Sequence, residues 1–414
     1  MFYVGIDIAR DFNIVSIIDK SEMIIKKPFR VNNTLKAYEK FISKLQTISS
    51  KHSNFLLGLE ATGVYGENLL AFLTNHGFSV KLLNPFQTKR YRERITMKKV
   101  KNDNIDSLMI AHFLKDGKFS SGYVTDDEYQ SLRTLYRNRA SLQSDIKEIK
   151  KRILTNISVT FLEFESIVDP FSICGLALLD KYPTASHYHH SSVDRILKLF
   201  RHIKGNNFSK DKAQRLLDAA RFSTYSGKAY EARGIAIRST IRLLRNYQNE
   251  LLLLEEEIRS LLGKNKVLTS DKTEDTLKKS NTLVDNLKTI PGVSDKTIAA
   301  ILSECGDITR FPTLTKFIGY LGLFPTENSS GNSKRIGHLS KRGSSLAKHA
   351  LYMSSVSCLI HNDQLKQLYD IKRSQGKSKK EALVVVSRKL ASIIYAIIRY
   401  NTPYDPARVF TVKS

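Results

Sequence analysis

Short apolar runs and apolar positions at helical spacing follow one another through the first quarter of the chain. Strands are predicted where an apolar run is short and bounded by polar residues, at 2–8, 13–18, 23–25, 55–60 and 78–83. Helices are predicted where apolar residues recur every three or four positions, at 34–45, 66–74 and 103–114. The resulting order, β-β-β-α-β-α-β-α, predicts a mixed α/β sheet with helices packed on it.

The rest of the chain is predicted to be mainly helical. Helices are expected at 129–164, 230–262, 344–361 and 379–400, with shorter helical pieces between the first two. In 230–262 the apolar residues recur at steps of three, four and seven, which fits either a coiled-coil arm for self-association or the core helix of a bundle. Residues 263–280 are polar and charged and are predicted to be a linker or exposed loop. These changes of pattern divide the chain into three predicted domains, 1–125, 126–284 and 285–414.

Four carboxylates occupy positions that suggest more than a surface role. Asp7 lies inside an apolar strand, and Glu60 closes another. Asp103 and Asp106 lie on one side of the first turn of the helix at 103–114, where acidic residues can also simply complement the helix dipole. All four can converge at one edge of the sheet, and they would then repel one another unless cations neutralised them. Mg²⁺ prefers oxygen ligands, and two such ions suit phosphodiester cleavage, so the set predicts a metal site.

The charge of the chain indicates a polyanionic partner. Its 414 residues include 66 basic and 40 acidic residues, which gives a net charge of +26 and a pI of about 9.8. Nucleic acid is the simplest such partner, and solubility through net charge is the alternative.

Several kinds of segment and motif are not found in the sequence, and this limits the classes of protein to which the chain can belong. No apolar run reaches the roughly 18 residues of a transmembrane helix, and residues 1–7 lack the basic segment of a signal peptide. Cys174, Cys305 and Cys358 lie far apart, without zinc or disulfide spacing, so a reducing cytoplasm is expected. The sequence has no Walker A and no GxGxxG motif.

Two segments have the character of phosphate contacts. A basic loop is predicted over 89–101, and it includes Lys98, Lys99 and Lys101. The turn Ile290-Pro291-Gly292-Val293 joins two predicted helices and resembles a helix-hairpin-helix. In that motif backbone N–H groups hold a phosphate without reading sequence; an ordinary helical turn is the alternative.

A third segment combines small residues with cations. The apolar stretch 317–325 leads into a loop rich in Ser, Gly and Asn, flanked by Lys334, Arg335, Lys341 and Arg342. Small residues permit close backbone approach, and the cations suit phosphate. Composition alone predicts a flexible basic loop here, and it does not identify a serine nucleophile, because no general base is fixed by the sequence.

Two sets of motifs, in the expected order, resemble the transposases of the IS110/IS1111 group of insertion sequences. These proteins are also called DEDD transposases or bridge-RNA-guided recombinases. The N-terminal set, within 2–150, comprises Gly5-Ile6-Asp7, Leu59-Glu60-Ala61-Thr62-Gly63, Asn84-Pro85 and Lys101-Asn102-Asp103-Asn104-Ile105-Asp106. The C-terminal set, within 285–370, comprises Ile290-Pro291-Gly292-Val293, Tyr320-Leu321-Gly322-Leu323-Phe324-Pro325, Ser330-Gly331 and Lys341-Arg342-Gly343.

The resemblance implies a role for each motif residue. Asp7, Glu60, Asp103 and Asp106 match the metal-binding tetrad of a RuvC-like, RNase H-type domain, with two Mg²⁺ ions expected and Mn²⁺ as an alternative. Ser330, next to Gly331, matches the serine that is expected to attack the DNA phosphate and form a phosphoserine link.

The resemblance also implies domains and partners. It implies a RuvC-like domain over 1–125, a helical or coiled-coil region over 126–284, and a mostly helical transposase domain with a helix-hairpin-helix over 285–414. The expected partners are donor and target DNA, a noncoding bridge RNA, and further copies of the chain in a dimer or tetramer. The two halves of the site are then expected to come from different protomers.

The sequence departs from the family pattern at three positions. Ser329 precedes Ser330 and shares its chemistry. Ser344 and Lys348 stand where the family often has Asn and Arg.

Besides the transposase function that the resemblance implies, two other functions fit part of the same sequence. A RuvC-like, structure-selective nuclease that activates water with metal ions would need the four carboxylates but not Ser330. A non-catalytic nucleic-acid-binding scaffold would tolerate loss of Asp7 or Asp106.

Overall fold

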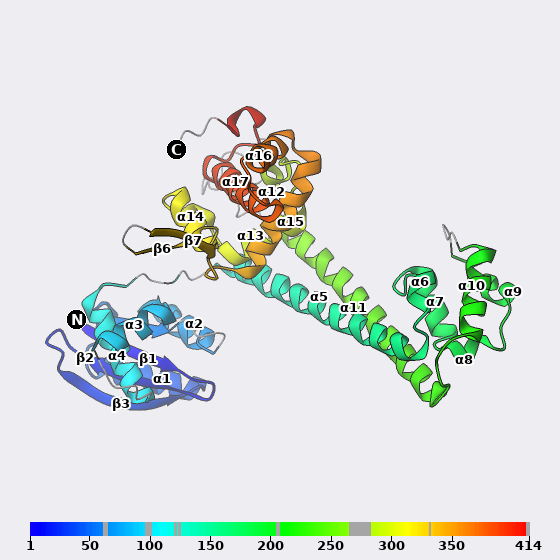
Figure 1. Ribbon diagram of the computed structural model, residues 1–414. Coiled ribbons are helices and arrows are strands. Elements are labelled where there is room, and N and C mark those ends of the chain that lie inside the picture. Colours follow the sequence, from blue (N-terminus) through cyan, green and yellow to red (C-terminus); the bar gives the residue numbers. More distant parts are fainter. Residues whose placement is uncertain are drawn as a thin grey trace. The chain divides into compact units, whose positions relative to one another are not determined.

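A computed structural model of the chain describes residues 1–60, 65–95, 102–119, 122, 126–203, 208–264, 283–330 and 333–410. Two compact units make up the chain, Met1–Val124 and Thr125–Ser414 (Figure 1). Among the described residues, no helix combines the length and apolar character needed to cross a membrane.

Five strands form one mixed sheet in the first unit, in the order β3-β2-β1-β4-β5. Neighbours among β1, β2 and β3 pair antiparallel, whereas β1 with β4 and β4 with β5 pair parallel. The strands are β1 (Phe2–Ile8), β2 (Phe12–Ile18), β3 (Ile24–Asn32), β4 (Phe55–Glu60) and β5 (Ser79–Leu83). The predicted mixed α/β sheet is therefore confirmed.

The third strand is longer than the predicted 23–25. It continues through Lys26, Lys27 and Pro28, residues that do not by themselves indicate a strand. β3 is an edge strand, where lysines face solvent and a proline need not donate a ladder hydrogen bond, so pairing with β2 extends it.

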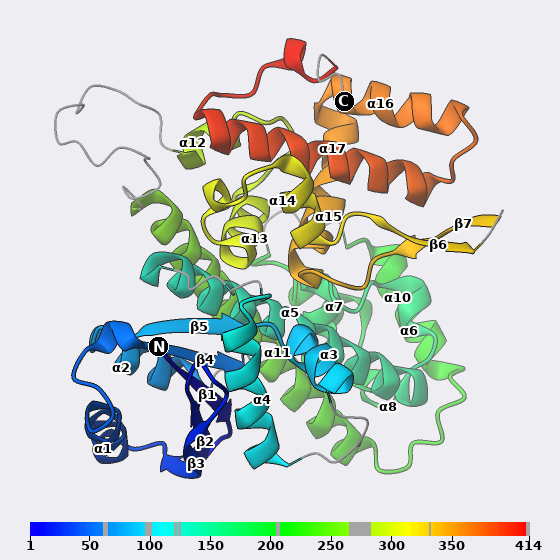
Figure 2. The same cartoon turned by 90° about the vertical axis from the view of Figure 1, so that its left-hand side faces the viewer.

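Helices cover both faces of the sheet. On one face Val4, Ile6 and Leu57 belong to a buried cluster shared with α1 (Leu35–Gln46) and α2 (Glu67–Asn75). The other face is covered by α4 (Asp103–Asp116), which contacts β1, β2 and β4 (Figure 2). α3 (Pro85–Ile95) packs against α4.

Gly5 and Gly58 allow α4 to lie directly on the sheet. A Cβ atom on Gly5 would stand 2.0 Å from the Ser107 carbonyl oxygen, and one on Gly58 would stand 2.6 Å from the Leu114 side chain. Real Cβ atoms do not approach backbone this closely, so glycine in β1 is a packing requirement of this fold.

The second unit is built around two long antiparallel helices, α5 (Asp127–Thr160) and α11 (Tyr230–Lys264). Near one end of the pair, Leu132 of α5 and Ile258 of α11 share a buried cluster; farther along, Ile153 and Ile241 share another. Figure 1 shows the pair running between two groups of shorter helices. The first group comprises α6 (Phe164–Ile167), α7 (Ile173–Lys181), α8 (Ala185–Tyr188), α9 (Val193–Lys198) and α10 (Lys210–Arg221).

The apolar positions of α11 face the same chain. Ile237, Ile241 and Leu244 are fully buried in the cluster that α11 forms with α5. This matches the core-helix alternative for these positions, and a coiled-coil arm for self-association stays a prediction. The predicted linker at 263–280 falls mostly outside the described residues.

The second group of helices forms the C-terminal core. Its members are α12 (Leu283–Lys288), α13 (Asp295–Cys305), α14 (Leu314–Leu321), α15 (Ser345–His361), α16 (Asp363–Ser374) and α17 (Lys379–Tyr400). Single 3-10 turns occur at His52–Asn54, Ile308–Arg310 and Pro406–Arg408. The predicted helical character of the chain after the sheet is confirmed.

The predicted flexible loop between α14 and α15 is instead a β-hairpin, β6 (Pro325–Ser330) and β7 (Ser333–Leu339) (Figure 2). The loop prediction was wrong because composition cannot show that two polar segments pair with each other. At the base of the hairpin, the Ser340 amide donates to the Phe324 carbonyl at 3.0 Å. The Lys348 ammonium donates to the carbonyls of Ser340 at 2.9 Å and Arg342 at 2.7 Å, which holds the chain where it leaves β7.

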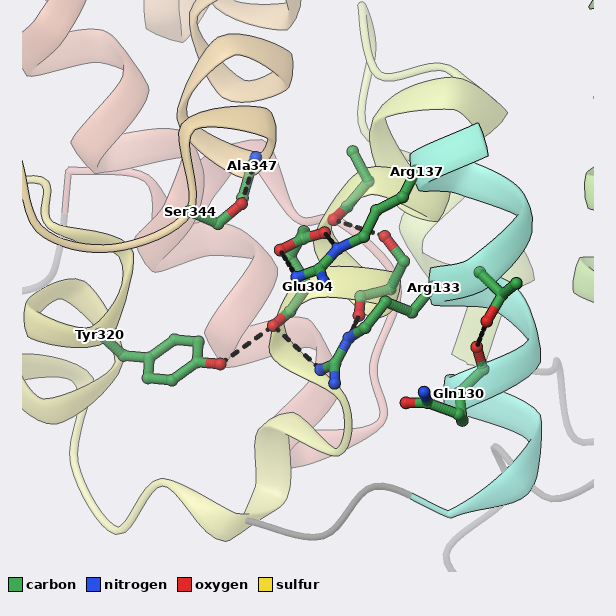
Figure 3. A network of polar contacts seen from close by, with 10 residues as sticks. Gln130, Arg133, Arg137, Glu304, Tyr320, Ser344 and Ala347 are labelled. Atoms are coloured by element: carbon green, nitrogen blue, oxygen red, sulfur yellow. Dashed lines mark hydrogen bonds and ion pairs between the residues drawn. The ribbon is translucent and has the colours of Figure 1, made fainter. Parts of the chain in front are cut away.

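A polar network ties α5 to α13 (Figure 3). Arg137 donates from Nε to Oε1 of Glu304 at 2.8 Å and from Nη2 to Oε2 at 3.1 Å, and the Tyr320 hydroxyl donates to the Glu304 carbonyl at 3.0 Å. Arg133 Nε donates to the Ser303 carbonyl at 2.8 Å. Burial by itself raises the pKa of the Glu304 carboxyl, but the hydrogen bonds and charge of Arg137, together with Ser344 and Arg133, outweigh it, and the pKa is lowered.

Candidate active site

Asp7 and Glu60 lie next to each other on neighbouring parallel strands. The last residue pair of the β1–β4 ladder is Ile6 with Leu59, and Asp7 and Glu60 are the next residue on each strand. Side chains alternate along a strand, so both carboxylates lie on the face of Gly5 and Gly58, the face that α4 covers.

α4 brings two more carboxylates to the same place. Asn102 caps the helix by accepting a hydrogen bond from the Asn104 amide at 3.0 Å, which places Asp103 and Asp106 in the first turn. Because Gly5 packs against Ser107, the N-terminal turn of α4 lies at the end of β1 that carries Asp7. The sequence prediction that the four carboxylates meet at one sheet edge thus agrees with their placement.

All four carboxylates line one cavity of about 450 Å³. The other lining residues come from the end of β1 and from α3 and α4: Ile8, Ala9, Pro85, Thr88, Lys89, Arg92, Met109 and Ile110. The cavity is therefore acidic on the sheet and α4 side and carries two cations from α3.

Part of the segment predicted to be a basic loop, 89–101, is helical and belongs to α3, so this part of the prediction was wrong. Residues through Ile95 are helical, and Asn84 explains why: its side-chain oxygen accepts from the Phe86 amide at 2.9 Å, and Pro85 supplies a helix-compatible φ at the first position. Lys98, Lys99 and Lys101 lie outside the described residues.

Two side chains of α3, one helical turn apart, contact the carboxylates. Thr88 donates through its hydroxyl to Glu60 Oε1. Arg92 Nη1 forms a 2.6 Å ion pair with Asp106 Oδ1, and the two side chains are 28% and 15% exposed. Thr88 and Arg92 are not among the residues predicted from the sequence; their i, i+4 spacing after Asn84-Pro85 is the signal that could have indicated a shared helix face.

The oxygen donors fit a hard divalent cation, because four carboxylates on one cavity are the ligand type that Mg²⁺ and Mn²⁺ take. In the described part of the chain, however, no three His, Cys, Asp or Glu side chains are gathered closely enough to hold a metal ion. The four side chains are therefore of the right chemical type for a metal ion, but their present spacing does not suit one. Arg92 and Thr88 contact two of the four carboxylates, those of Asp106 and Glu60.

The predicted serine and several predicted cations belong to the second unit. The backbone of Ser330 ends β6, where it is paired with Ser333 across the hairpin. Lys334 and Arg335 lie in β7, and Lys341 and Arg342 are exposed just after the hairpin.

Gly292 has a packing role that the sequence did not indicate. Its φ of +90° favours glycine, and a Cβ atom there would lie 2.8 Å from the Cα of Cys358 in α15. Ser354 of α15 also donates to the Gly292 carbonyl at 3.0 Å. The turn between α12 and α13 therefore rests on α15, and phosphate binding by it stays a prediction.

Two family models match separate parts of the chain. A transposase model of the IS110 DEDD type matches residues 4–162, and a model described as transposase IS116/IS110/IS902 family matches residues 284–370. The first match covers the carboxylate cavity, and the second covers the β6–β7 hairpin.

Individual relatives agree with these models. The chain is 34% identical to the insertion element IS110 43.6 kDa protein of Streptomyces coelicolor over 29% of each chain. It is 34% identical to the pilin gene-inverting protein of Moraxella bovis over 29% of this chain and 38% of the relative. It is 27% identical to the transposase for insertion sequence element IS1111A of Coxiella burnetii over 30% and 35%.

These three alignments each span less than two fifths of the relative's length. The family models, in contrast, match both the N-terminal and the C-terminal part of the chain in the order that its own motifs predict. The chain belongs to the IS110 family of transposases.

Proposed function

We propose that this protein is a DNA recombinase that excises and inserts a mobile element by cutting and rejoining phosphodiester bonds. The observation that carries the proposal is the convergence of Asp7, Glu60, Asp103 and Asp106 on one cavity, in a chain of a transposase family. The names of the relatives, a transposase and a pilin gene-inverting protein, belong to the same kind of chemistry.

The first unit is proposed to be a RuvC-like, RNase H-type domain. The strand order β3-β2-β1-β4-β5, with three antiparallel strands followed by two parallel ones, supports this assignment. In such an arrangement the carboxyl edge of β1 and β4 is the place where functional side chains gather.

Ser330 is the proposed nucleophile. Its hydroxyl oxygen would form a bond to the phosphorus of the scissile phosphate while the bond from phosphorus to the 3′-oxygen breaks. The serine proton would leave to a base, and the 3′-oxygen would take up a proton. The phosphate remains on the 5′ end of the downstream fragment, now linked to Ser330, and reversing the same steps with a new 3′-hydroxyl rejoins the strand.

The four carboxylates are proposed to hold Mg²⁺, two ions in the full site, with Mn²⁺ able to replace it. A bound divalent cation would supply charge stabilisation to the phosphate oxygens and to the leaving 3′-oxygen. The carboxylates and Ser330 would come from different copies of the chain, so a dimer or tetramer is part of the proposal.

Guidance by a noncoding bridge RNA is proposed from the family resemblance. A net charge of +26 supports a protein that carries both RNA and DNA. The basic residues Lys98, Lys99, Lys101, Lys334, Arg335, Lys341 and Arg342, with the helix-hairpin-helix turn at Gly292, are the proposed backbone contacts. Base pairing with the RNA would then supply the choice of sequence.

The test is a strand-cleavage assay with full-length protein, Mg²⁺, RNA transcribed from the noncoding flank of the element, and matched DNA. Wild type, Ser330→Ala, Asp106→Asn and the neighbouring Ser329→Ala would be compared on denaturing gels that detect a covalent protein–DNA adduct. We expect the adduct in wild type and Ser329→Ala, and its loss in the other two.

Two other outcomes would overturn parts of the proposal. Cleavage that survives Ser330→Ala without an adduct would identify a nuclease that uses water. Binding without cleavage in any protein, including wild type, would identify a nucleic-acid-binding scaffold.

A further inference from the structure

The carboxylate cavity contains its own counter-ion. Arg92 reaches from α3 to Asp106, and this arginine has no place in the motif set that indicated the function. One turn earlier on the same face of α3, Thr88 donates to Glu60. One short helix therefore engages a carboxylate from β4 and a carboxylate from α4.

This contact competes directly with a metal ion. The 2.6 Å bond occupies an oxygen of Asp106, and the Asp106 side chain is only 15% exposed, so solvent screens the pair weakly. A divalent cation bound to Asp106 would lie close to the positive charge of the Arg92 guanidinium, and repulsion between the two cations favours release of the arginine.

We propose that Arg92 is the counter-ion of the metal-free cavity, is released from Asp106 when metal binds, and then contacts the phosphate of the substrate. The inference rests on the proposed function. After its release, the guanidinium still lines the cavity in which a phosphodiester would bind, and planar donors of this kind bind phosphate oxygens well. Arg92 then opposes metal binding before the substrate arrives and favours the substrate afterwards.

The proposal predicts opposite changes in two measurements on the same variant. In Arg92→Gln, Mn²⁺ used as a probe should bind the full-length protein about tenfold more tightly, because a competing positive charge has been removed. DNA cleavage at saturating Mn²⁺ should fall at least about tenfold, because the phosphate has lost a cationic donor. A residue with a merely structural role would weaken both.

Mn²⁺ binding would be followed by electron paramagnetic resonance of the unbound ion, without nucleic acid. Arg94→Gln is the matched control: it removes the same charge from the same helix, but Arg94 pairs with Asp116, which does not line the cavity. Arg94→Gln should leave Mn²⁺ affinity within about twofold. The double variant Arg92→Gln/Asp106→Asn should lose the gain, because the contested ligand is gone.

Each result has one meaning. Equal Mn²⁺ affinity in wild type and Arg92→Gln, with cleavage still dependent on Asp106, would overturn the role of Arg92 and leave the proposed function standing. Absence of Mn²⁺ binding in both would instead count against the metal-assisted function itself. Thermal unfolding of each variant shows whether an altered affinity comes from a damaged fold, and Arg92→Lys offers a second, milder substitution.

Discussion

At the scale of single residues, glycine and carboxylate within one short motif serve different purposes, packing and chemistry. Asp7 contributes an oxygen donor, whereas Gly5, two positions earlier on the same face of β1, makes room for α4. If Gly5 carried a side chain, α4 could not bring Asp103 and Asp106 to the sheet. The short motif Gly5-Ile6-Asp7 thus combines packing on one face, core burial of Ile6 on the other, and chemistry at its end.

Gly5→Ala should therefore damage both stability and site. The added Cβ would stand 2.0 Å from the Ser107 carbonyl oxygen and 2.5 Å from the Ala111 amide nitrogen, both backbone atoms that cannot step aside. We expect a loss of about 1–3 kcal/mol in the free energy of unfolding, measured by urea denaturation. Gly319→Ala is the control: nothing lies within 4 Å of its added Cβ in helix α14, so it should be neutral or stabilising by up to about 1 kcal/mol. Equal effects of the two would contradict the packing argument.

At the scale of elements, contacts between helices far apart in sequence hold the second unit together. The Arg137–Glu304 pair joins α5 to α13, and Gly292 lets the α12–α13 turn rest on α15. These contacts fix α13 against α5 and the α12–α13 turn against α15.

Arg137→Gln should destabilise the protein in a pH-dependent way. The lowered pKa of Glu304 in the folded state means that its ionised form stabilises the fold at pH values above the ordinary carboxyl range, and that this stabilisation is lost as the pH falls through the lowered value. At pH 7 we expect a loss of about 1–3 kcal/mol, less than for a fully buried pair because the Arg137 side chain is 58% exposed.

The same difference in unfolding free energy should shrink at acid pH, as the pH falls through the lowered pKa of Glu304 and the carboxyl is protonated in the wild type as well. Urea denaturation across pH 3–7 measures it. Lys151→Gln, which removes an exposed pair with Glu148 from the same helix, should change stability by less than about 0.5 kcal/mol at every pH. A wild-type advantage that persists unchanged at acid pH would contradict the assignment.

At the scale of the whole molecule, the excess of 26 positive charges governs how the protein interacts with polyanions. It is spread over both units rather than confined to one segment, and the chain should therefore bind polyanions along an extended surface.

The proposed binding to nucleic acid should consequently depend steeply on salt. If six or more phosphates are contacted, the affinity for duplex DNA should fall by about a thousandfold or more between 50 and 200 mM salt, because bound cations are released from the DNA. Fluorescence anisotropy with a DNA of unrelated sequence measures the slope. A nearly flat dependence on salt would show that the positive charge serves solubility instead.

The sequence by itself determined the elements whose pattern is local. Apolar runs fixed the strands at 2–8 and 55–60, helical spacing fixed the helix that begins at Asp103, and strand alternation together with the first turn of that helix indicated where the carboxylates would meet. These features need only neighbouring residues, so they can be read without the fold.

Only the tertiary structure decided which distant segments became partners. Arg92 and Thr88 face the carboxylates because α3 packs on α4, although the sequence around Arg92 reads as a basic loop. The polar stretch 325–339 became a hairpin because its two halves pair with each other, and α11 buried its apolar stripe against α5 of the same chain. The physical reason is common to all three: backbone pairing and burial depend on what lies opposite a segment, and composition does not encode that.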